Sequence, residues 1–293
     1  MRVVVLFAAI LLVSIMMLGC SDSRQIISPA DQTNLGQLVQ RPEFVDNRPQ
    51  AIISSFTKYA SAEYSAYKPP KPPPDTGGGD PNPNPAHKYA YIVGISDYEG
   101  TANDLQFCDD DAQDMKSYFQ SQGFTIRMDL DRNATADAVE AGLNWLVASA
   151  APGDEIAFAY SGHGAKAQGY GSSIISTDLW YLTHGWVMQF FNAANCSKKH
   201  FTLDACQVGD FSSNCATGTM MALASANTYS YDAPDLHNGA WTYYWIDGVE
   251  NHGKIYAEDA ATYAEAGMKA WASLYHLRVS PNHTDKYTGK FDI

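Results

Sequence analysis

The chain has 293 residues, 45% of them apolar, with 18 Tyr, 12 Phe and six Trp, enough to build a substantial core. Its 32 Asp and Glu outnumber the 19 Lys and Arg, which gives a formal net charge of -13. An anionic chain of this kind argues against nucleic-acid binding and favours cationic partners.

The first twenty residues have the pattern of an export signal. Arg2 supplies a positive charge, and Val3–Met17 form an apolar stretch that is short for a membrane span. The stretch ends in MLGC, which resembles the bacterial lipobox apart from its initial Met. The resemblance implies lipidation of Cys20 and a lipid-anchored, extracytoplasmic protein of the bacterial cell envelope. Ordinary signal cleavage and an uncleaved anchor remain alternatives.

The rest of the chain divides by composition into three segments. Residues 21–67 are polar and irregular, with one possible short helix over Ala51–Tyr64 that could act as an inhibitory pro-segment. Residues 68–86 are rich in Pro and Gly, as in an extended, partly flexible linker. Residues 87–293 carry the apolar periodicity of a folded domain.

Short apolar runs alternate with helical patterns in this domain. Strands are predicted over 89–96, 124–130, 155–161, 200–204 and 219–226, and helices over 109–122, 187–194, 240–249 and 258–274. A further helix is predicted after Thr135, a plausible N-cap, because Val139, Leu143 and Leu146 recur at helical spacing. This alternation predicts an α/β fold with a mostly parallel central sheet and helices on both faces. Ligands of such folds bind at the carboxyl ends of the strands.

Two residues suited to nucleophilic catalysis follow two of these strands. His163 lies in SGHG (161–164) and Cys206 in DACQVG (204–209). An imidazole promotes thiolate formation and then protonates the leaving amine, so this pair suits amide hydrolysis. A lone buried Cys or His is more often structural. Catalysis is favoured by their joint placement at the same predicted edge of the sheet.

The motifs AYSGHGA and, 43 positions later, TLDACQVG resemble the His and Cys motifs of the caspase/metacaspase superfamily. The segment YAYIVGISDYEGTANDLQFCDDDAQDM is similar to the first strand and helix of that superfamily, GAWTYY to its small-subunit helix, and YTGKF (287–291) to its final strand. The resemblance covers residues 88–293 and implies a caspase-haemoglobinase-like three-layer sandwich. It also implies that Cys206 is the nucleophile, His163 the general base and acid, and Gly164 a donor to the oxyanion.

Substrate preference follows from the same resemblance. Metacaspases line a pocket for basic side chains with residues that match Cys108, Asp111, Ser161 and Asp204. Two carboxylates facing a bound side chain attract Arg or Lys and repel Asp. The predicted substrates are therefore proteins or peptides with basic residues. For the run Asp109–Asp111 a simpler interpretation also holds, since acids in a first helical turn interact favourably with the helix dipole.

The chain departs from the metacaspase pattern in two places. Many relatives have Cys-His-Ser-Gly where this chain has CQVG (206–209), so neighbouring subsites are expected to differ. Metacaspases that need calcium carry an acidic cluster between the two motifs, whereas here Asp178 and Asp204 are the acids between His163 and Cys206. A calcium site wants six to eight oxygens, so a calcium requirement is not expected, and no other cofactor is predicted.

Four cysteines remain beyond Cys20: Cys108, Cys196, Cys206 and Cys215. An exported protein keeps disulfides, and four cysteines allow three pairings. A nucleophilic Cys206 must stay reduced, so at most one bridge is expected, with Cys196–Cys215 as the favoured pair. No zinc site is predicted, because His and Cys do not cluster locally.

The predicted enzyme is a monomeric, single-chain endopeptidase. From His200 to Gly253 there is no Lys or Arg, so an enzyme that cuts after basic residues has no site there for separating its two halves. Self-cleavage is expected near the tether, for example after Lys68, Lys71 or Lys88. A catalytically silent surface adaptor and a structural lipoprotein are the alternatives; the first has no need of the His and Cys, and the second leaves the motifs unexplained.

Overall fold

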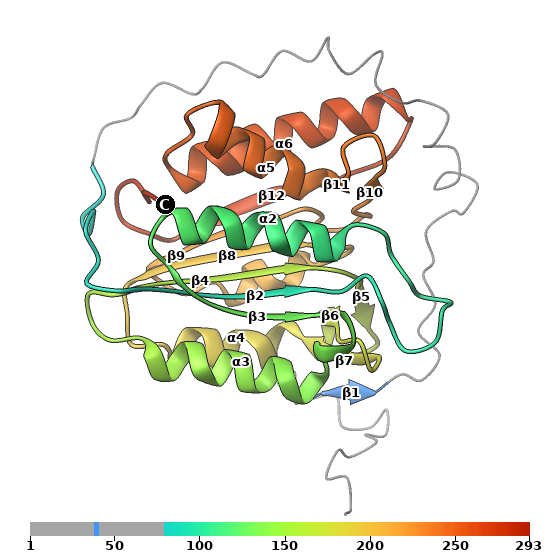
Figure 1. The fold of residues 1–293 in the computed structure, drawn as a ribbon, viewed down its shortest axis with the longest axis horizontal. Coiled ribbons are helices and arrows are strands. Elements are labelled where there is room, and N and C mark those ends of the chain that lie inside the picture. The colour runs from blue at the N-terminus through green and yellow to red at the C-terminus, as the bar shows by residue number, and fades with distance from the viewer. Residues whose placement is uncertain (1–37, 41–78) are drawn as a thin grey trace, which may run out of the picture.

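The computed structural model describes residues 38–40 and 79–293. Six strands form its central sheet in the order β12-β9-β8-β4-β2-β3 (Figure 1). They are β2 (Lys88–Gly94), β3 (Thr125–Leu130), β4 (Glu155–Ser161), β8 (Lys198–Asp204), β9 (Thr219–Leu223) and β12 (Asn282–Asp285). Neighbouring strands from β3 to β9 are parallel, while β12 is antiparallel to β9. The predicted mostly parallel sheet is confirmed.

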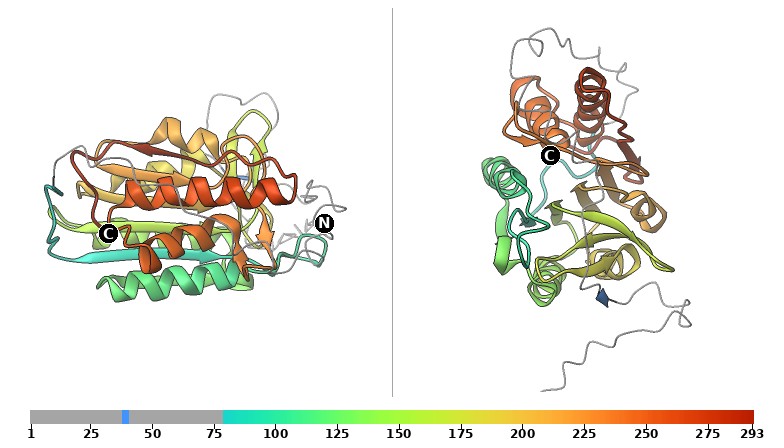
Figure 2. Two further views of the ribbon diagram at one scale, coloured as in Figure 1. Left: turned by 90° about the horizontal axis from the view of Figure 1, so that it is seen from above. Right: turned by 90° about the vertical axis from the view of Figure 1, so that its right-hand side faces the viewer.

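Helices cover both faces of this sheet. Helices α2 (Cys108–Ser121), α5 (Ala240–Asn251) and α6 (Ala257–Leu274) lie on one face, and α3 (Ala136–Ser149) and α4 (His184–Ala193) on the other. The view along the strands separates the layers (Figure 2, right). The Thr135 side chain accepts a hydrogen bond from the Ala138 amide, as expected of an N-cap, a contact that typically stabilises a helix by about 1 kcal/mol. The three-layer α/β architecture is therefore confirmed.

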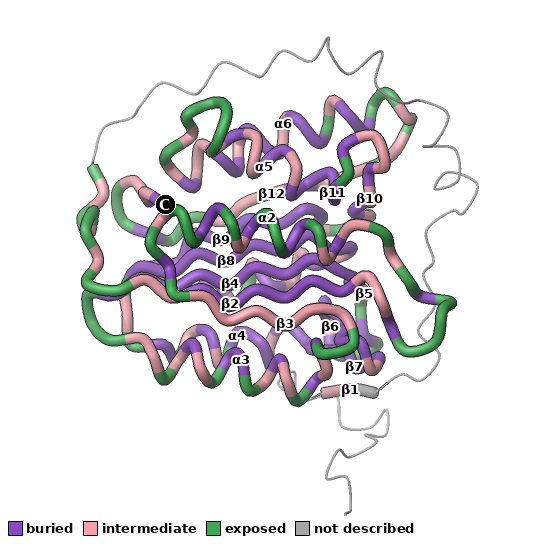
Figure 3. The backbone as a smooth tube through the Cα atoms, in the orientation of Figure 1, coloured by how far each residue is buried: buried purple, intermediate pink, exposed green. Residues whose placement is uncertain are grey.

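The core lies on both sides of the two central strands. Every residue of β4 and β8 is buried, whereas the edge strands β3 and β12 are largely half-exposed (Figure 3). Alternate residues of β2 point to opposite faces: Tyr91 and Val93 pack with α3 and α4, and Ala90 and Ile92 with α2, α5 and α6. Burial on both faces explains why these strands are continuous apolar runs in the sequence.

Several short strands lie outside the central sheet. A second, antiparallel sheet has the order β1-β7-β6-β5, formed by β1 (Val39–Gln40), β7 (Trp180–Thr183), β6 (Gly171–Ile175) and β5 (Gly164–Ala167). A small hairpin joins β10 (Asp232–Ala233) to β11 (Asn238–Gly239). Short 3-10 helices are η3 (Asp131–Asn133) and η4 (Gly209–Asn214). Strand β5 begins immediately after His163, so the second sheet adjoins the candidate site.

The expectation of a final strand over residues 287–291 is wrong. The last strand is Asn282–Asp285, and a turn follows it, in which the Asp285 side chain accepts the Tyr287 amide. Tyr287 and Phe291 instead pack their rings together 4.9 Å apart, and Phe291 is fully buried. Core packing rather than strand pairing thus explains the aromatic residues of this segment.

Other predictions fall on residues that the structure does not describe. The signal segment with Cys20, the possible helix Ala51–Tyr64 and the candidate cleavage sites Lys68 and Lys71 all lie outside the described residues. Lys88 is described and begins β2, paired with β4 in the sheet, so it is not part of an open tether. Within residues 38–40 and 79–293, no helix combines the length and apolarity needed to cross a bilayer.

Buried ion pairs hold the start of the described domain against the sheet. The ammonium of Lys198, fully buried at the start of β8, lies 2.7 Å from a carboxylate oxygen of Asp80, 3.1 Å from Asp292 and 3.3 Å from Glu155. These contacts gather both ends of the domain at the amino ends of the strands. Removing one member of such a buried pair typically costs about 3–5 kcal/mol, because the other charge is left unpaired.

His200 provides a test of the core that is independent of function. Its ring is fully buried beside Phe119, Trp245 and Phe291, and burial lowers its pKa to about 3. An unfolded-state His titrates near 6.5, so between about pH 6.5 and 3 the unfolded chain binds the extra proton and this residue makes stability fall as pH falls. We expect His200→Leu to remove up to about 1.4 kcal/mol of destabilisation per pH unit in that window.

Urea unfolding of the wild type and His200→Leu at pH 7 and pH 4.5 checks this expectation. The two proteins should diverge at the lower pH, with the variant the more stable. Exposed His276, in a left-handed turn conformation, supplies the control His276→Asn, which should behave as wild type. Parallel loss of stability in wild type and His200→Leu between the two pH values would contradict the expectation.

Candidate active site

The register of β4 and β8 brings the two candidate catalytic residues to one edge of the sheet. Ser161 is the partner of Asp204 in this parallel pair, and the Gly162 amide donates to the Asp204 carbonyl at 3.2 Å. His163 and Cys206 each lie two residues beyond that last pair. Because adjacent strands are about 4.8 Å apart, the two residues lie side by side at the carboxyl ends of the strands.

Close backbone packing at Gly164 joins the two segments. A Cβ atom at this position would lie 2.2 Å from the Cys206 carbonyl oxygen and 2.9 Å from its amide nitrogen, so only glycine fits. The His163 carbonyl accepts a hydrogen bond from the Ile175 amide. Hydrogen-bonded and non-hydrogen-bonded residue pairs alternate along an antiparallel ladder, so the next pair, Gly164 and Ile174, is not hydrogen-bonded. The Gly164 N–H therefore points away from β6 and makes no hydrogen bond to that strand.

His163 is held by its main chain and by its ring. Its amide donates to the Tyr98 hydroxyl at 2.8 Å, and its carbonyl accepts from the Tyr160 hydroxyl at 2.8 Å. In the ring, Nε2 lies 2.7 Å from the Asn103 carbonyl oxygen. A carbonyl only accepts hydrogen bonds, so Nε2 carries the proton of the neutral ring and Nδ1 keeps a lone pair. In this tautomer Nδ1 is the ring nitrogen that can accept a proton.

Cys206 sits at the start of a sharp turn beyond β8 and is 9% exposed. The Ser230 amide donates to its Sγ at 3.3 Å, and the thiol donates to the Ser230 carbonyl at 3.6 Å. The following residue, Gln207, has a left-handed φ of 55°, and its carbonyl accepts from the Ser172 hydroxyl at 2.5 Å. Strand β6 thus helps to fix the turn that carries the thiol.

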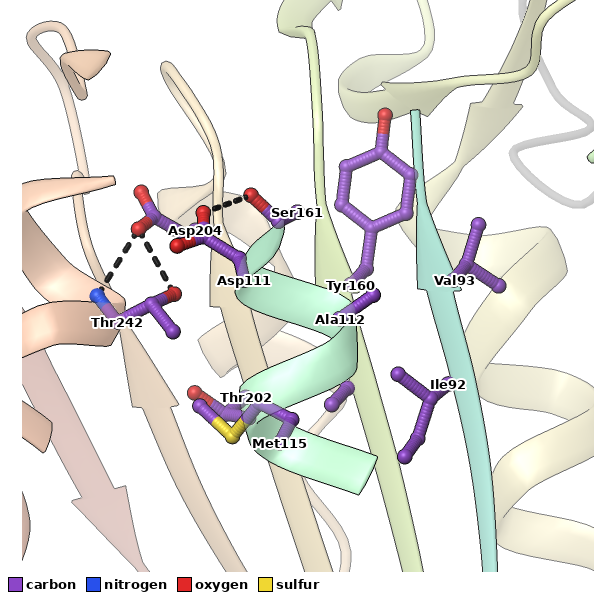
Figure 4. A pocket seen from close by; sticks show the side chains of 11 residues that line it. Ile92, Val93, Asp111, Ala112, Met115, Tyr160, Ser161, Thr202, Asp204 and Thr242 are labelled. Atoms are coloured by element: carbon purple, nitrogen blue, oxygen red, sulfur yellow. Dashed lines mark hydrogen bonds between the residues drawn. The ribbon is translucent and has the colours of Figure 1, made fainter. Parts of the chain in front are cut away.

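The two acidic pocket candidates converge next to this pair (Figure 4). Asp111 on α2 accepts from the Ser161 hydroxyl at 2.6 Å and the Gly239 amide at 2.8 Å. Asp204 at the end of β8 accepts from the Thr242 amide and hydroxyl, both at 3.0 Å. A Cβ on Gly239 would lie 2.6 Å from Asp111 Oδ2 and 2.3 Å from Asp204 Oδ2, so these oxygens lie within about 5 Å of each other.

Burial and mutual repulsion disfavour the ionised forms of these carboxyls. Asp111 is fully buried and Asp204 is 5% exposed. Burial raises the pKa of Asp204 to about 6. Burial, and then the charge of Asp204, raise the pKa of Asp111 well above its usual range. A cation placed between them would relieve both effects.

Little empty space lies beneath the pair. A cavity of about 10 Å³ separates α2 from the sheet, lined among others by Met115 and Thr202 (Figure 4). That volume is close to the minimum that admits one water. A substrate side chain would therefore have to reach the carboxylates from outside rather than fill a deep hole below them.

Comparison with known protein families identifies the family to which this chain belongs. Residues 87–274 match the model of the caspase domain. The chain belongs to the caspase family of cysteine peptidases.

Metacaspases are among the similar proteins. Metacaspase-2 of Arabidopsis thaliana is 27% identical over 59% of this chain and 55% of its own length. Metacaspase-1 of Mycosarcoma maydis is 31% identical over 30% of this chain and 26% of its own length, and metacaspase-2 of Trypanosoma brucei brucei 34% over 29% and 27%. The chain thus spans about a quarter to just over half of these relatives' lengths.

The fold is shared with a solved structure. The crystal structure of protein GSU0716 from Geobacter sulfurreducens aligns with a TM-score of 0.53 and 15% identity, over 69% of this chain and 94% of that one. At this identity the likeness concerns the fold alone.

Cys108 lies at the margin of the acidic pair of this caspase domain. It begins α2, and its Sγ lies 3.8 Å from a carboxylate oxygen of Asp232. Burial raises the pKa of its thiol well above the usual range, so it remains protonated. Cys108, Asp111, Ser161 and Asp204 are thus gathered in one region, with the Cys108 sulfur directed at a third carboxylate.

Other residues of the site were not predicted. Ser230 contacts both Cys206 and Asp204, and Asp232 accepts the Gln106 amide at 3.0 Å beside Cys108. Asn103 contributes through its carbonyl, which any residue could supply. The sequence SANTYSYDAP (225–234) offers polar residues after an apolar run, but it contains no pattern that marks Ser230 or Asp232 individually.

The expected disulfide is contradicted by the structure, in which neither Cys196 nor Cys215 is part of a disulfide. Cys196 Sγ contacts the Lys198 carbonyl at 3.9 Å, and Cys215 Sγ contacts the Thr219 and Thr284 carbonyls at 3.8 and 3.9 Å. The two sulfurs are turned to different backbone partners. Burial raises the pKa of both thiols to about 11.

The described residues contain no group of three or more His, Cys, Asp or Glu side chains placed to bind a metal. Asp178, between the His and Cys motifs, caps α3 instead: its Oδ1 accepts the Ala136 amide at 2.9 Å. The acid thus has a local structural role at the start of that helix.

Proposed function

We propose that this caspase domain is an endopeptidase that hydrolyses peptide bonds after Arg or Lys, with Cys206 as nucleophile and His163 as base and acid. The observation that carries the proposal is the contact at Gly164, which packs the His163 and Cys206 segments directly together. A chance pair of structural residues has no need of this proximity.

The proposed reaction has two halves. Nδ1 of His163 takes the Cys206 proton, and the thiolate attacks the substrate carbonyl carbon. The Gly164 and Cys206 amides are the proposed donors to the resulting oxyanion, a contribution of typically about 3 kcal/mol per donor. The imidazolium then protonates the leaving amine, and a thioester remains. In the second half His163 deprotonates a water, which releases the acid product and the free thiol.

The preference for basic residues rests on Asp111 and Asp204. Their carboxylates already accept hydrogen bonds from Ser161, Thr242 and Gly239, and yet they lack a buried counterion among the contacts described above. Two close carboxylates without a cation are costly when both ionise. A substrate guanidinium or ammonium would supply the missing charge, whereas a substrate Asp would add a third anion.

The test is hydrolysis of fluorogenic peptides ending in Arg, Lys or the neutral arginine isostere citrulline, in reducing buffer with and without calcium. We expect release after Arg and Lys and at least about 100-fold less after citrulline, as for loss of a buried charge pair. Cys206→Ala serves as the blank. An adaptor without catalysis would cleave none of the peptides under any of these conditions.

We also propose that the enzyme stays one chain. Residues 200–253 contain no Lys or Arg, so it has no basic site there for cutting itself. Intact-mass measurement after prolonged incubation should show no product cut in that stretch; any self-cleavage should fall upstream of the domain, after Lys68 or Lys71. A fragment ending between residues 200 and 253 would refute the single-chain proposal.

The export and lipid anchor of Cys20 are a separate proposal, supported by the sequence MLGC alone. Metabolic labelling with a fatty-acid analogue should mark the wild type and not Cys20→Ala. Labelling of both proteins, or of neither in a bacterial host that lipidates a control protein, would exclude the anchor.

A further inference from the structure

Ser230 touches both halves of the proposed site. It follows β9 and is 5% exposed. Its amide donates to Cys206 Sγ at 3.3 Å, while its hydroxyl donates a short hydrogen bond to Asp204 Oδ1. One residue therefore contacts the proposed nucleophile through its main chain and the proposed specificity carboxylate through its side chain.

We propose that Ser230 is a positioning residue that couples occupation of the acidic pair by a cationic side chain to the reactivity of the Cys206 thiol. This inference rests on the proposed function, because it takes Asp204 as the group that binds a basic residue and Cys206 as the nucleophile. It adds a regulatory property to that site: a basic substrate helps to activate the thiol that attacks it.

The coupling follows from the charge on Asp204. Without a cation, burial disfavours the ionised carboxylate, and its pKa rises to about 6. A bound guanidinium keeps Asp204 ionised, so the Ser230 hydroxyl then donates to a full negative charge. Charge-assisted hydrogen bonds are shorter and about twice as strong as neutral ones. The Ser230 side chain is thereby held more firmly, and with it the amide that faces Sγ.

The Ser230 amide stabilises the thiolate more than the thiol, since a hydrogen bond to the charged form of a group favours that form. Holding this amide on the sulfur therefore raises the thiolate fraction. The Ser230 carbonyl, which accepts from the protonated thiol at 3.6 Å, moves with the same residue. A shift of Ser230 thus acts on both protonation states of Cys206.

Thr242 supplies a matched comparison on the same carboxylate. Its hydroxyl donates to Asp204 Oδ2 at 3.0 Å, and it is 2% exposed. Its position in α5 separates it from the sulfur contacts of Ser230. Removing either hydroxyl deletes one hydrogen bond to Asp204. Ser230 differs from Thr242 in that its main-chain amide also donates a hydrogen bond to Cys206 Sγ.

The experiment measures alkylation of Cys206 by iodoacetamide at pH 5, where most of the Asp204 carboxyl is protonated in the absence of a cation, followed by mass spectrometry of a chymotryptic peptide that separates Cys206 from Cys215. The ligands are n-butylguanidinium and its neutral isostere n-butylurea. In the wild type we expect the charged ligand to accelerate alkylation about fivefold over the neutral one, as for one hydrogen bond to a charged group. In Ser230→Ala we expect less than about a twofold difference, and in Thr242→Val the wild-type response.

Ser230→Thr keeps the hydroxyl and should retain the response, which also keeps the test valid if the alanine variant folds poorly. Equal acceleration in wild type and Ser230→Ala would overturn the coupling, as would its loss in Thr242→Val or its absence in the wild type. Because alkylation needs no peptide hydrolysis, the two proposals fail separately. If the protein cleaves no peptide but its alkylation responds to the cation, the coupling stands and the proposed peptidase function does not. If it cleaves peptides but its alkylation does not respond, the peptidase function stands and the coupling does not.

Discussion

Replacing Cys206 by alanine is expected to lower kcat for an Arg peptide by about 10⁴-fold or more, which is about 5.5 kcal/mol of barrier. His163→Ala should cost a similar factor, because the thiol then lacks both the base that ionises it and the acid that protonates the leaving amine. Residues that act as one unit are strongly non-additive, so the double variant should be about as slow as either single variant. Initial rates with the fluorogenic Arg peptide measure all three.

Cys215→Ala is the matched control for the cysteine. Its thiol is also buried and free, but its contacts are backbone carbonyls away from His163. It should keep activity within a few-fold. His163→Ala also leaves the Asn103 carbonyl without its ring partner, so a thermal melt must show that the variant is folded. Equal hydrolysis by wild type and Cys206→Ala would refute the proposed nucleophile.

The long buried elements could be predicted because several sequence signals agree. EIAFAYS is wholly apolar apart from its ends and follows a Pro-Gly turn, and it is strand β4 with the predicted bounds. Gly123 stands just beyond α2 with a positive φ of 84°, as expected where a helix stops. The parallel arrangement then follows from strands that alternate with helices.

The short elements could not be predicted, because their sequences carry little strand character. Strand β5 is GAKA and β12 is NHTD, which are short and poor in β-branched or aromatic residues. They form strands because neighbouring strands present unpaired backbone groups to them. Tyr287 and Phe291 show the converse: aromatic residues predicted to be strand are buried by packing instead.

The residues of the candidate site also differ in whether they could be predicted from the sequence. His163, Cys206, Asp111 and Asp204 lie at the ends of long elements, so their place at one edge of the sheet could be predicted. The strand order and register that put β4 beside β8 could not, because no pattern in the sequence specifies which strands pair. Tyr98, Asn103 and Ser230 reach the site from loops, whose course depends on tertiary contacts. The prediction of a Cys196–Cys215 disulfide is wrong for a related reason, because the number of cysteines does not specify where their sulfur atoms point.

Asp204→Asn should remove most of the preference for basic residues. The substitution keeps the size of the side chain and deletes one of two close carboxylates, so a bound guanidinium loses a buried partner. Truncating such a pair costs about 2–5 kcal/mol, and we expect kcat/KM for the Arg peptide to fall at least about 30-fold. The citrulline peptide, which gains nothing from the charge, should change by less than about threefold. Asp110→Asn, an exposed carboxyl in the same helical turn as Asp111, is the matched control.

The pH dependence of this preference distinguishes the acidic pair, Asp111 and Asp204, from the proposed catalytic pair, His163 and Cys206. Burial raises the pKa of Asp204 to about 6, so the free carboxyl is increasingly protonated, and neutral, as pH falls through 6. The ratio of kcat/KM for Arg over citrulline should therefore fall below about pH 6 in the wild type. Because kcat/KM reports ionisation of the free enzyme, titration of His163 and Cys206 before binding affects both peptides alike and cancels in the ratio.

Asp204→Asn should lower activity toward the Arg peptide but raise stability relative to wild type as pH rises. Because the folded pKa of Asp204 lies above its unfolded value of 3.8, the folded state binds more protons between pH 3.8 and 6, and this carboxyl makes stability fall as pH rises through that window. Asp204→Asn lacks that titration, so relative to wild type it should gain stability between pH 4 and pH 7 in urea unfolding. A specificity ratio that is unchanged by Asp204→Asn and flat with pH would show that recognition of basic residues, if present, does not reside in this pair.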